Sequence, residues 1–487
     1  MNRQHTAVAA VNAHLDRHGA EVISEFCDLL ALPNVSADLE DVRAVASHIS
    51  TMLESRGIAP QLVTMDGAAP IVSGRIHIGD HAPTIGIYAH YDGQPVDEAA
   101  WTSPPFDPTI FDRDGTSVTL GETIDPDWRI RARSASDDKA PVQAFVSALD
   151  ALSAAGVEPA VNVVLLFEGE EEAGSPHLRE YLEQNAEMFA ADMWLICDGP
   201  VHQTGHPQVI FGVRGIAQID ITVLGPTRGL HSGHYGNWIP NPTWKLVHLL
   251  ASMRDAEGNA LIEGFYSDVV PPTPAEMGAV AEVPAYEDDL LRDLGVRTPE
   301  GGGESHIERM FLPSLNLRGF AAGRAGADAA NVLPDSATAS FDIRLPPGHD
   351  PDEMLDRVEA HIASQGFHVM HEMPDQETRL QHDSIAVIDR DPHYTGMRVP
   401  LDGREGVAVL DAARAAAEGE EVVAMPTLGG SVPIVHFADV LRAPTIITPM
   451  ANHDNNQHDA NENIRIGNLW YGIRLMASLL TTDYRPE

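Results

Sequence analysis

Hydrophobic and polar residues alternate along this chain with two different periods. In the first 70 residues, apolar side chains recur every three to four positions, at Val8, Val11, Leu15, Val22, Phe26, Leu29 and Leu30. This spacing predicts helices that each bury one face against the rest of the protein. Further along, the apolar residues instead form short continuous runs at 84–88, 161–167 and 193–196, with a helical pattern at 141–152.

Buried strands that alternate with helices are typical of an α/β protein. Short strands that are apolar throughout are expected in a parallel sheet, because helices then cover both of its faces. We therefore predict an α/β fold with a mainly parallel sheet and helices on both faces.

A different pattern begins near residue 214. Residues 217–223 and 337–344 alternate between apolar and polar side chains, and residues 242–253 have helical periodicity. Residues 269–303 are rich in proline, glycine and acidic residues, which predicts loops and short helices. Apolar runs like the first ones return after residue 420. The pattern predicts a smaller α+β domain at 214–388, inserted between the two parts of a larger domain at 1–213 and 389–487.

Composition restricts the class of protein. No apolar run approaches the roughly 18 residues of a membrane span, and the N-terminus lacks the apolar stretch of a secretory signal. The two cysteines, Cys27 and Cys197, are too few for a disulfide framework, which predicts a cytoplasmic protein. A formal net charge of −41 excludes a nucleic-acid partner, because phosphate binding needs a basic surface. Either a coding bias or adaptation to high salt explains this acidity.

Carboxylate and imidazole side chains follow several predicted strands. His90 comes soon after the strand at 84–88, Glu171 and Glu172 after the strand at 161–167, and Asp198 after the strand at 193–196. Ligands bind beyond the carboxyl ends of the strands in such sheets, so these side chains are predicted to share one site. Two further candidates are Asp137, near the start of a predicted helix, and His458, within a polar run at 451–462.

Each candidate also has an ordinary structural explanation when it is taken alone. Asp137 is typical of a helix N-terminus, where acidic residues cap free N–H groups. Consecutive glutamates are usually solvated, and a loop histidine such as His458 is commonly exposed. Asp92 lies two residues after His90, on the same side of an extended segment. It is therefore placed to accept a hydrogen bond from the imidazole, as carboxylates beside metal-bound histidines do.

Taken together, the segments resemble the M20 metallopeptidase family, and within it the carnosinase-like dipeptidases. The resemblance rests on residues 101–106, 136–142, 168–175, 230–233, 429–433 and 458–462 in this order, in addition to His90 and Asp92. Acetylornithine deacetylase and a bacterial glutamate carboxypeptidase belong to the same family. Residues 132–135 and Ala140 replace glycines that the family usually has, and the segment at 116–127 is long. These departures bear on substrate specificity more than on catalysis.

The resemblance implies a site for two divalent metal ions. Zinc is the first expectation, and manganese or cobalt are the alternatives, because the expected ligands are nitrogen and oxygen without thiolate. One ion would be bound by His90, Asp137 and Asp198, and the other by Asp137, Glu172 and His458. Asp137 would then bridge the two ions.

The resemblance also implies roles for residues outside the ligand set. Glu171 would be the general base, and Asp92 would orient His90. The inserted domain would serve as a lid and dimerisation domain, from which His231 reaches the partner's site to stabilise the oxyanion. The residues implied to hold the substrate carboxylate are Arg344, Gly430 and Ser431.

The function predicted from these residues is hydrolysis of an amide bond in a small, peptide-like substrate with a free carboxylate. The enzyme would be a binuclear dipeptidase or a carboxypeptidase-like relative, acting as a homodimer without nucleic-acid or membrane partners. An N-acyl amino acid deacylase with the same site is the alternative. A non-catalytic relative that only binds small molecules is a more distant one, because such a protein is expected to have lost some of the ligands.

Overall fold

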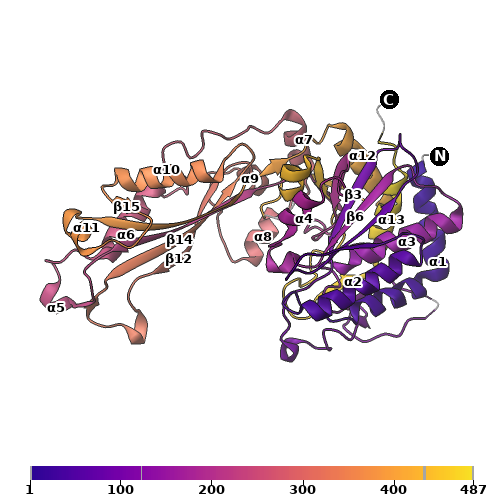
Figure 1. Ribbon diagram of the computed structural model, residues 1–487, viewed down its shortest axis with the longest axis horizontal. Coiled ribbons are helices and arrows are strands. Elements are labelled where there is room, and N and C mark those ends of the chain that lie inside the picture. Colours follow the sequence, from indigo (N-terminus) through magenta and orange to yellow (C-terminus); the bar gives the residue numbers. More distant parts are fainter. Residues whose placement is uncertain (1–2, 122, 431–434, 485–487) are drawn as a thin grey trace.

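The computed structural model describes residues 3–121, 123–430 and 435–484. It has two lobes, which lie side by side along the long axis in Figure 1. The large lobe holds both chain termini, and the small lobe projects from it as a narrow, extended unit. No helix in the described part of the chain is both long enough and apolar enough to cross a bilayer.

An eight-stranded sheet forms the centre of the large lobe. Its strands, in spatial order, are β1 (Gln61–Val63), β2 (Ile71–Ile76), β6 (Asn162–Glu168), β3 (Thr84–His90), β7 (Met193–Ile196), β19 (Thr445–Ile447), β8 (Gln208–Ile210) and β18 (Val423–Met425). β3 is parallel to both β6 and β7, β19 is parallel to β7, and β18 is parallel to β8. The antiparallel pairs are β1 with β2, β2 with β6, and β19 with β8.

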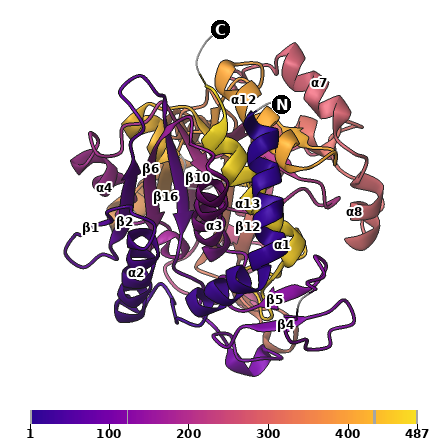
Figure 2. The same cartoon turned by 90° about the vertical axis from the view of Figure 1, so that its right-hand side faces the viewer.

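Helices cover both faces of this sheet because successive strand residues point to opposite sides. Val163 and Leu165 belong to one apolar cluster, whereas Val164 and Leu166 belong to another. On the first face pack α1 (Arg3–Leu30), α2 (Leu39–Glu54), α3 (Lys139–Ala155), α12 (Arg404–Ala416) and α13 (Ile466–Thr481), and Figure 2 views this side. On the second face pack α4 (Leu178–Gln184), α9 (His306–Met310) and η4 (Phe437–Leu441). The predicted α/β fold with a mainly parallel sheet is confirmed.

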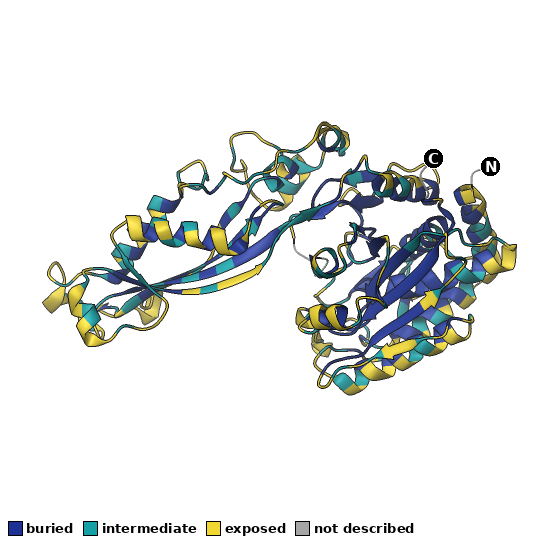
Figure 3. Ribbon diagram, turned by 45° about the horizontal axis from the view of Figure 1, so that its top comes forward, coloured by how far each residue is buried: buried dark blue, intermediate teal, exposed yellow. Residues whose placement is uncertain are grey.

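The small lobe is built on a five-stranded sheet. Its order is β12 (Ser314–Ala321), β14 (Ser336–Leu345), β10 (Gly215–Leu224), β16 (Ile385–Tyr394) and β15 (His368–Met370). The helices α6 (Pro242–Met253) and α10 (Pro351–Ser364) pack on it through a separate apolar cluster. β12 is an edge strand with several exposed residues, whereas the sheet of the large lobe is mostly buried (Figure 3).

The remaining elements of the small lobe are short. They are β11 (Leu230–His231), α5 (Ser232–Tyr235), η3 (Gly326–Asp328), β13 (Val332–Leu333) and α11 (Gln376–Gln381). The two crossings between the lobes lie next to each other, because β9 (Gly212–Val213) pairs with β17 (Met397–Arg398). The predicted domain change at residue 389 falls within β16, whose pairing with β10 extends to Tyr394. The division into domains stays a prediction.

The segment predicted to form loops and short helices packs against the large lobe. It contains α7 (Pro274–Glu282) and α8 (Glu287–Asp293) and is followed by α9. Arg398 forms a buried ion pair with Glu276 of α7 at 2.6 Å, and its guanidinium lies over the ring of Phe311. This contact attaches the segment to the start of the second crossing.

A small three-stranded antiparallel sheet lies beside the large one. Its order is β20 (Asn463–Arg465), β5 (Arg129–Arg131) and β4 (Thr109–Phe111). Two short turns of helix, η1 (Glu98–Ala100) and η2 (Glu171–Ala173), complete the large lobe. β5 leads into the segment that carries Asp137, and β20 follows the loop that carries His458, so this sheet connects two parts of the predicted site.

Candidate metal centre

The predicted ligands lie at one edge of the large sheet. His90 is the last residue of β3, and Glu172 lies in η2, directly after β6. Asp198 follows β7, and Asp137 immediately precedes the N-cap of α3. β3 lies between β6 and β7, so these carboxyl ends are neighbours.

Asp137 lies between two imidazoles. Its Oδ1 is 2.9 Å from Nε2 of His90, and its Oδ2 is 3.0 Å from Nε2 of His458. Nε2 of His458 is also 3.3 Å from Oε2 of Glu172. The ligand atoms of Asp137, Glu172 and His458 all lie within 4.8 Å of one another, a spacing suited to one metal ion.

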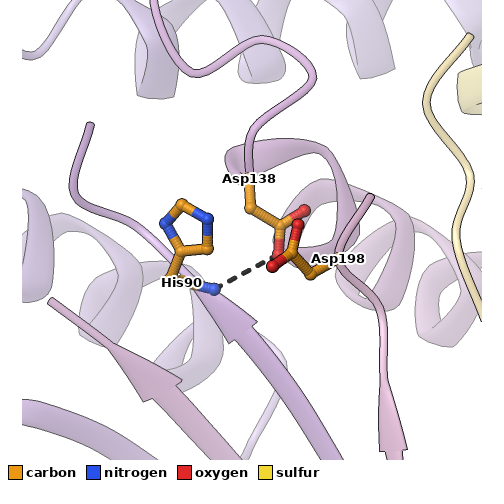
Figure 4. Close-up of side chains that lie close together, drawn as sticks. All are labelled: His90, Asp138 and Asp198. Carbon is orange, nitrogen blue, oxygen red and sulfur yellow. Dashed lines mark hydrogen bonds between the residues drawn. The ribbon is translucent and has the colours of Figure 1, made fainter. Parts of the chain in front are cut away.

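A second group joins His90 and Asp198 with Asp138. The ligand atoms of these three residues also lie within 4.8 Å of one another. Figure 4 shows the two carboxylates close together beside the imidazole, and the backbone N–H of His90 donates to Oδ2 of Asp138 at 3.2 Å. The sequence resemblance implies that Asp137 alone is shared by both ions. It implies no role for Asp138, which the structure places in this group.

Asp92 joins two parts of the site. Its Oδ1 lies 3.3 Å from Nδ1 of His90, on the side of the ring away from Asp137. The same carboxylate accepts hydrogen bonds from the backbone N–H groups of Glu171 (3.2 Å) and Glu172 (3.1 Å), and from the hydroxyl of Ser36 (2.8 Å). Asp92 therefore also fixes the turn that carries both glutamates, in addition to the imidazole that it was predicted to orient.

Most of the carboxylates have a raised pKa. Burial, together with the charge of Asp137, raises the pKa of Glu172 to about 7 and that of Asp198 to about 6. Burial also raises the pKa of Asp138 and of Glu171 above their usual range. Burial acts in the same direction on Asp137, but hydrogen bonds from the histidines outweigh it and lower the pKa of that carboxyl.

This cluster needs positive charge that the described side chains do not supply. Over residues 3–121, 123–430 and 435–484, no arginine or lysine forms an ion pair with the carboxylates of Asp92, Asp137, Asp138, Glu171, Glu172 or Asp198. Oδ1 of Asp138 is buried and has no hydrogen-bond partner. A buried charge is costly unless it is paired or bound to metal, so the residues fit a site for divalent cations. Nitrogen and oxygen ligands without thiolate suit zinc, manganese or cobalt.

Glu462 is a residue of the site that sequence analysis quoted without a role. Its carboxylate is wholly buried, and one oxygen accepts hydrogen bonds from the backbone N–H groups of Ser136 (2.9 Å) and Asp137 (3.0 Å). The other accepts from Nη1 of Arg133 (2.8 Å) and from the N–H of Ser134 (2.8 Å). This network ties the loop of His458 to the loop of Asp137. An acidic residue in a polar run carries no signal of such burial.

The predicted residues of the small lobe are not brought to this cluster. His231 directly precedes α5, which lies at the end of the small lobe remote from the large one (Figure 1). Its Nδ1 accepts from the backbone N–H of Gly233 at 3.2 Å. Arg344 lies on β14, and its Nε donates to Asp342 at 3.0 Å.

The glycine-rich segment lies where the two lobes meet. Gly430 is exposed, and Ser431 lies outside the described residues. The carbonyl of Gly429 accepts a hydrogen bond from Nη2 of Arg214 at 3.0 Å. Arg214 had no predicted role, yet it also lies near enough to Arg344 for that charge to lower its pKa, after burial, to about 10.

Comparison with known proteins agrees with this geometry. The profile of peptidase family M20/M25/M40 matches residues 86–482. The Cys-Gly metallodipeptidase dug1 of Schizosaccharomyces pombe is 26% identical over 95% of this chain and 96% of its own length. The human Beta-Ala-His dipeptidase is 24% identical over 96% of this chain and 90% of its own length.

A solved structure extends the likeness to the fold. The M20 family metallo-carboxypeptidase Sso-CP2 from Sulfolobus solfataricus superposes with a TM-score of 0.77 and 27% identity, covering 94% of this chain and 98% of that one. The resemblance inferred from the sequence motifs is therefore confirmed. The chain belongs to peptidase family M20/M25/M40 and is a hydrolase of the metallopeptidase class.

Proposed function

We propose that this protein is a dipeptidase that uses two divalent metal ions. The observation that carries the proposal is the position of Asp137, whose two oxygens face Nε2 of His90 at 2.9 Å and Nε2 of His458 at 3.0 Å. A carboxylate between two imidazoles is suited to hold two cations at once. We assign Asp198 to the ion near His90, and Glu172 to the ion near His458.

Ions held by these residues would supply Lewis acidity, to polarise a scissile carbonyl and increase the acidity of water. Glu171 is the proposed general base. Burial raises the pKa of its carboxyl, and the nearby charges of Asp198 and Asp137 raise it further, although His90 opposes them. Glu171 then takes a proton from the attacking water and delivers it to the leaving amine nitrogen. Asp92 keeps Glu171 in place through its backbone N–H.

The proposed substrate is a dipeptide with a free carboxylate. The related proteins support this class, because their names describe a Cys-Gly metallodipeptidase, a Beta-Ala-His dipeptidase and a metallo-carboxypeptidase. Arg344 is proposed to bind the carboxylate, since a guanidinium pairs with it through two hydrogen bonds. Gly430 and Ser431 are proposed to hold the same end of the substrate.

We further propose that the enzyme is a homodimer joined through the small lobe. His231 is the N-cap of α5, which lies at the end of the small lobe remote from the large lobe (Figure 1), so a role on the oxyanion requires that it act in the partner's site. Large apolar side chains are exposed on the small lobe: Trp238 is 74% exposed, Trp244 is 64% exposed, and Leu317 and Phe320 lie exposed on the edge strand β12. Such a surface is typical of a protein interface. A monomer in light scattering that kept full activity would refute the dimer.

A substrate screen with metal analysis tests the main proposal. The purified protein is reconstituted in turn with zinc, manganese and cobalt and assayed on dipeptides and on matched N-acyl amino acids. We expect two equivalents of metal per chain and faster turnover of the dipeptides. Preference for N-acyl amino acids would favour the deacylase alternative, and failure to bind metal would refute both. The cytoplasmic location stays a prediction.

A further inference from the structure

The outer face of the three-stranded sheet is basic, although the protein as a whole is acidic. Successive residues of a strand point to opposite sides. On the inner side, Ile110, Ile130 and Ile464 are buried in the apolar core. On the outer side, the register places Arg129 directly between Arg465 and Phe111, and places Arg131 between Asn463 and Thr109.

This face forms the floor of an open cavity of about 470 Å³. The charged residues that line it are Arg113, Arg129, Arg131, Arg465, Asp112, Asp127 and Asp454, and the asparagines are Asn456, Asn461 and Asn463. Arginines thus outnumber acids in the lining. Over the whole chain the balance is the reverse, with 31 lysines and arginines against 72 acidic residues. The charge balance in this cavity is therefore opposite to that of the whole chain.

Three of the arginines already have carboxylate partners. Asp127 pairs with Arg113 and also with Arg465, whose Nη2 lies 2.5 Å from its Oδ1. Asp454 pairs with Arg129 at 2.6 Å. Like charges directly opposite each other on neighbouring strands destabilise a sheet, so these two aspartates offset the repulsion between Arg129 and Arg465.

Arg131 differs from the other three. Among the residues that the structure describes, no carboxylate forms an ion pair with it. Its guanidinium lies 4.0 Å from the ring centroid of Phe111 and donates to the hydroxyl of Thr102. These contacts hold the guanidinium in place, and none of its N–H groups donates to a carboxylate of the described residues. Arginine stays charged at neutral pH, so a cation is held at the cavity wall without an anion.

We propose that this cavity binds a small multivalent oxyanion, with Arg131 as its main ligand. The planar guanidinium pairs in bidentate fashion with phosphate or carboxylate oxygens, and the side-chain amides of Asn456 and Asn461 suit the remaining oxygens. Phosphate and a short dicarboxylate share this chemistry. The cavity is distinct from the metal centre, because none of the predicted metal ligands lines it.

The bound anion would act on the metal centre through the cavity wall. Asn461 lies three residues after His458, and its Oδ1 accepts hydrogen bonds from the N–H and hydroxyl of Thr102, both at 2.8 Å. Thr102 in turn contacts Arg131. The arginine, the threonine and the loop of His458 therefore form one connected network, so we expect occupancy of the cavity to change activity.

Isothermal titration of the metal-loaded, full-length protein tests the proposal. Inorganic phosphate and succinate are titrated separately, with chloride used to keep the ionic strength constant. We expect one saturable site for at least one of them, which also identifies the class of anion. R131Q should weaken that binding at least about tenfold, since a charge-assisted bidentate contact is lost. The control R414Q changes an exposed arginine that pairs with Asp411 outside the cavity, and should leave binding unchanged.

A second variant tests the proposal in the opposite direction. D454N removes the carboxylate that neutralises Arg129, so the anion should bind several-fold more tightly. A misfolded variant would not show such a gain in affinity. If the anion binds at the metal ions instead, its affinity will be the same for wild type and R131Q. This result would overturn the proposal. Absence of saturable binding of both anions to the wild type would also overturn it. If R131Q fails to fold, the change in affinity of D454N decides.

Discussion

The two lobes treat their predicted functional residues in opposite ways. In the large lobe, residues as distant in sequence as His90 and His458 both contact Asp137. In the small lobe, His231 is exposed and lies at the end remote from that centre. The first group meets because parallel strands end at one sheet edge. His231 has no such geometry within one chain, and the proposed dimer would bring it to the site of a partner.

The two groups also differ in how firmly the protein holds them. Asp92 contacts His90 and the backbone of Glu171 and Glu172, and both oxygens of its carboxylate have partners. The contacts of the His231 imidazole among the described residues are local, a hydrogen bond from the N–H of Gly233 and a ring contact with His234. The residues that Asp92 fixes are suited to bind ions before substrate arrives. An exposed histidine such as His231 is instead suited to enter the site of another subunit. Mutations in the two lobes should therefore have different consequences.

The largest effect is expected for E171Q in the large lobe. The amide keeps the shape of the side chain but cannot accept a proton, so kcat should fall about 10³-fold or more, as for loss of a general base. Metal content should remain at the wild-type value, because Glu171 is not among the proposed ligands. Steady-state kinetics with metal analysis checks both.

The adjacent E170Q is the matched control for that variant. The Glu170 carboxylate points away from the metal ligands and accepts from the N–H of Ala69 (2.9 Å) and Nδ1 of His177 (2.8 Å). Its kcat should change by less than about threefold, since the hydrogen-bond partners of this buried carboxylate, Ala69 and His177, lie outside the proposed ligands and base. Equal losses in the two variants would contradict the assignment of the base to Glu171.

The variant H231A tests whether the small lobe acts across a dimer. Loss of one oxyanion donor costs about 10²- to 10³-fold in kcat, and we expect that loss here with unchanged metal binding. Mixing H231A with E171Q sharpens the test, because each hybrid dimer has one intact site. Subunit exchange at equal amounts should restore about one quarter of the wild-type activity. No recovery, under conditions where exchange of labelled subunits is complete, would remove the role of His231 in trans.

The positions of the large-lobe candidates at one sheet edge could be predicted from the sequence, because strand ends can be located from apolar runs; their roles as ligands stay a prediction. His90 ends β3, and Glu172 and Asp198 follow β6 and β7. Contacts that depend on burial were not predictable, since nothing in a run of polar residues distinguishes a wholly buried glutamate such as Glu462 from a solvated one. The motif resemblance supplied His231 and Arg344, which no periodicity would indicate. β16 runs across the predicted domain boundary at residue 389, and its pairing with β10 extends to Tyr394, so an apolar pattern alone does not locate the boundary there.

Glu462 offers a way to loosen the large-lobe site without removing a ligand. In E462Q an amide N–H₂ group replaces one of the two oxygens, so a donor faces donors and hydrogen bonds are lost. Depending on which oxygen is replaced, the donors are those of Ser136 and Asp137 or those of Arg133 and Ser134. Mutation of a residue that supports metal ligands typically lowers metal affinity about 10- to 100-fold. We expect E462Q to lower it by about that factor.

Metal titration by competition with a chelating dye measures this loss. D459N is the matched control, since Asp459 is exposed in the same loop and only caps the N–H of Ala460 (2.7 Å). Its metal affinity should be unchanged. If excess metal restores the kcat of E462Q, Glu462 positions the ligands; if E462Q binds metal as tightly as wild type, that role is excluded.

The smallest effect concerns the pH dependence of stability, and it separates the charge-rich large lobe from the small lobe. Burial raises the pKa of Glu172 to about 7 and that of Asp198 to about 6 in the folded protein, whereas both ionise near pH 4 when unfolded. Without metal, the stability that these carboxyls contribute is therefore complete below about pH 4 and is lost as the pH rises through about 6 and 7.

We expect the free energy of unfolding of the chelated large lobe to fall by on the order of 2 to 4 kcal/mol between about pH 5 and pH 8. With metal bound, the decrease should be smaller, because cations stabilise the ionised carboxylates. Urea unfolding monitored at each pH, with and without chelator, measures the difference. The small lobe lacks such a cluster, so chelation should not alter its unfolding. Parallel curves for chelated and metal-loaded protein would mean that the carboxylates of Glu172 and Asp198 do not face the metal ions.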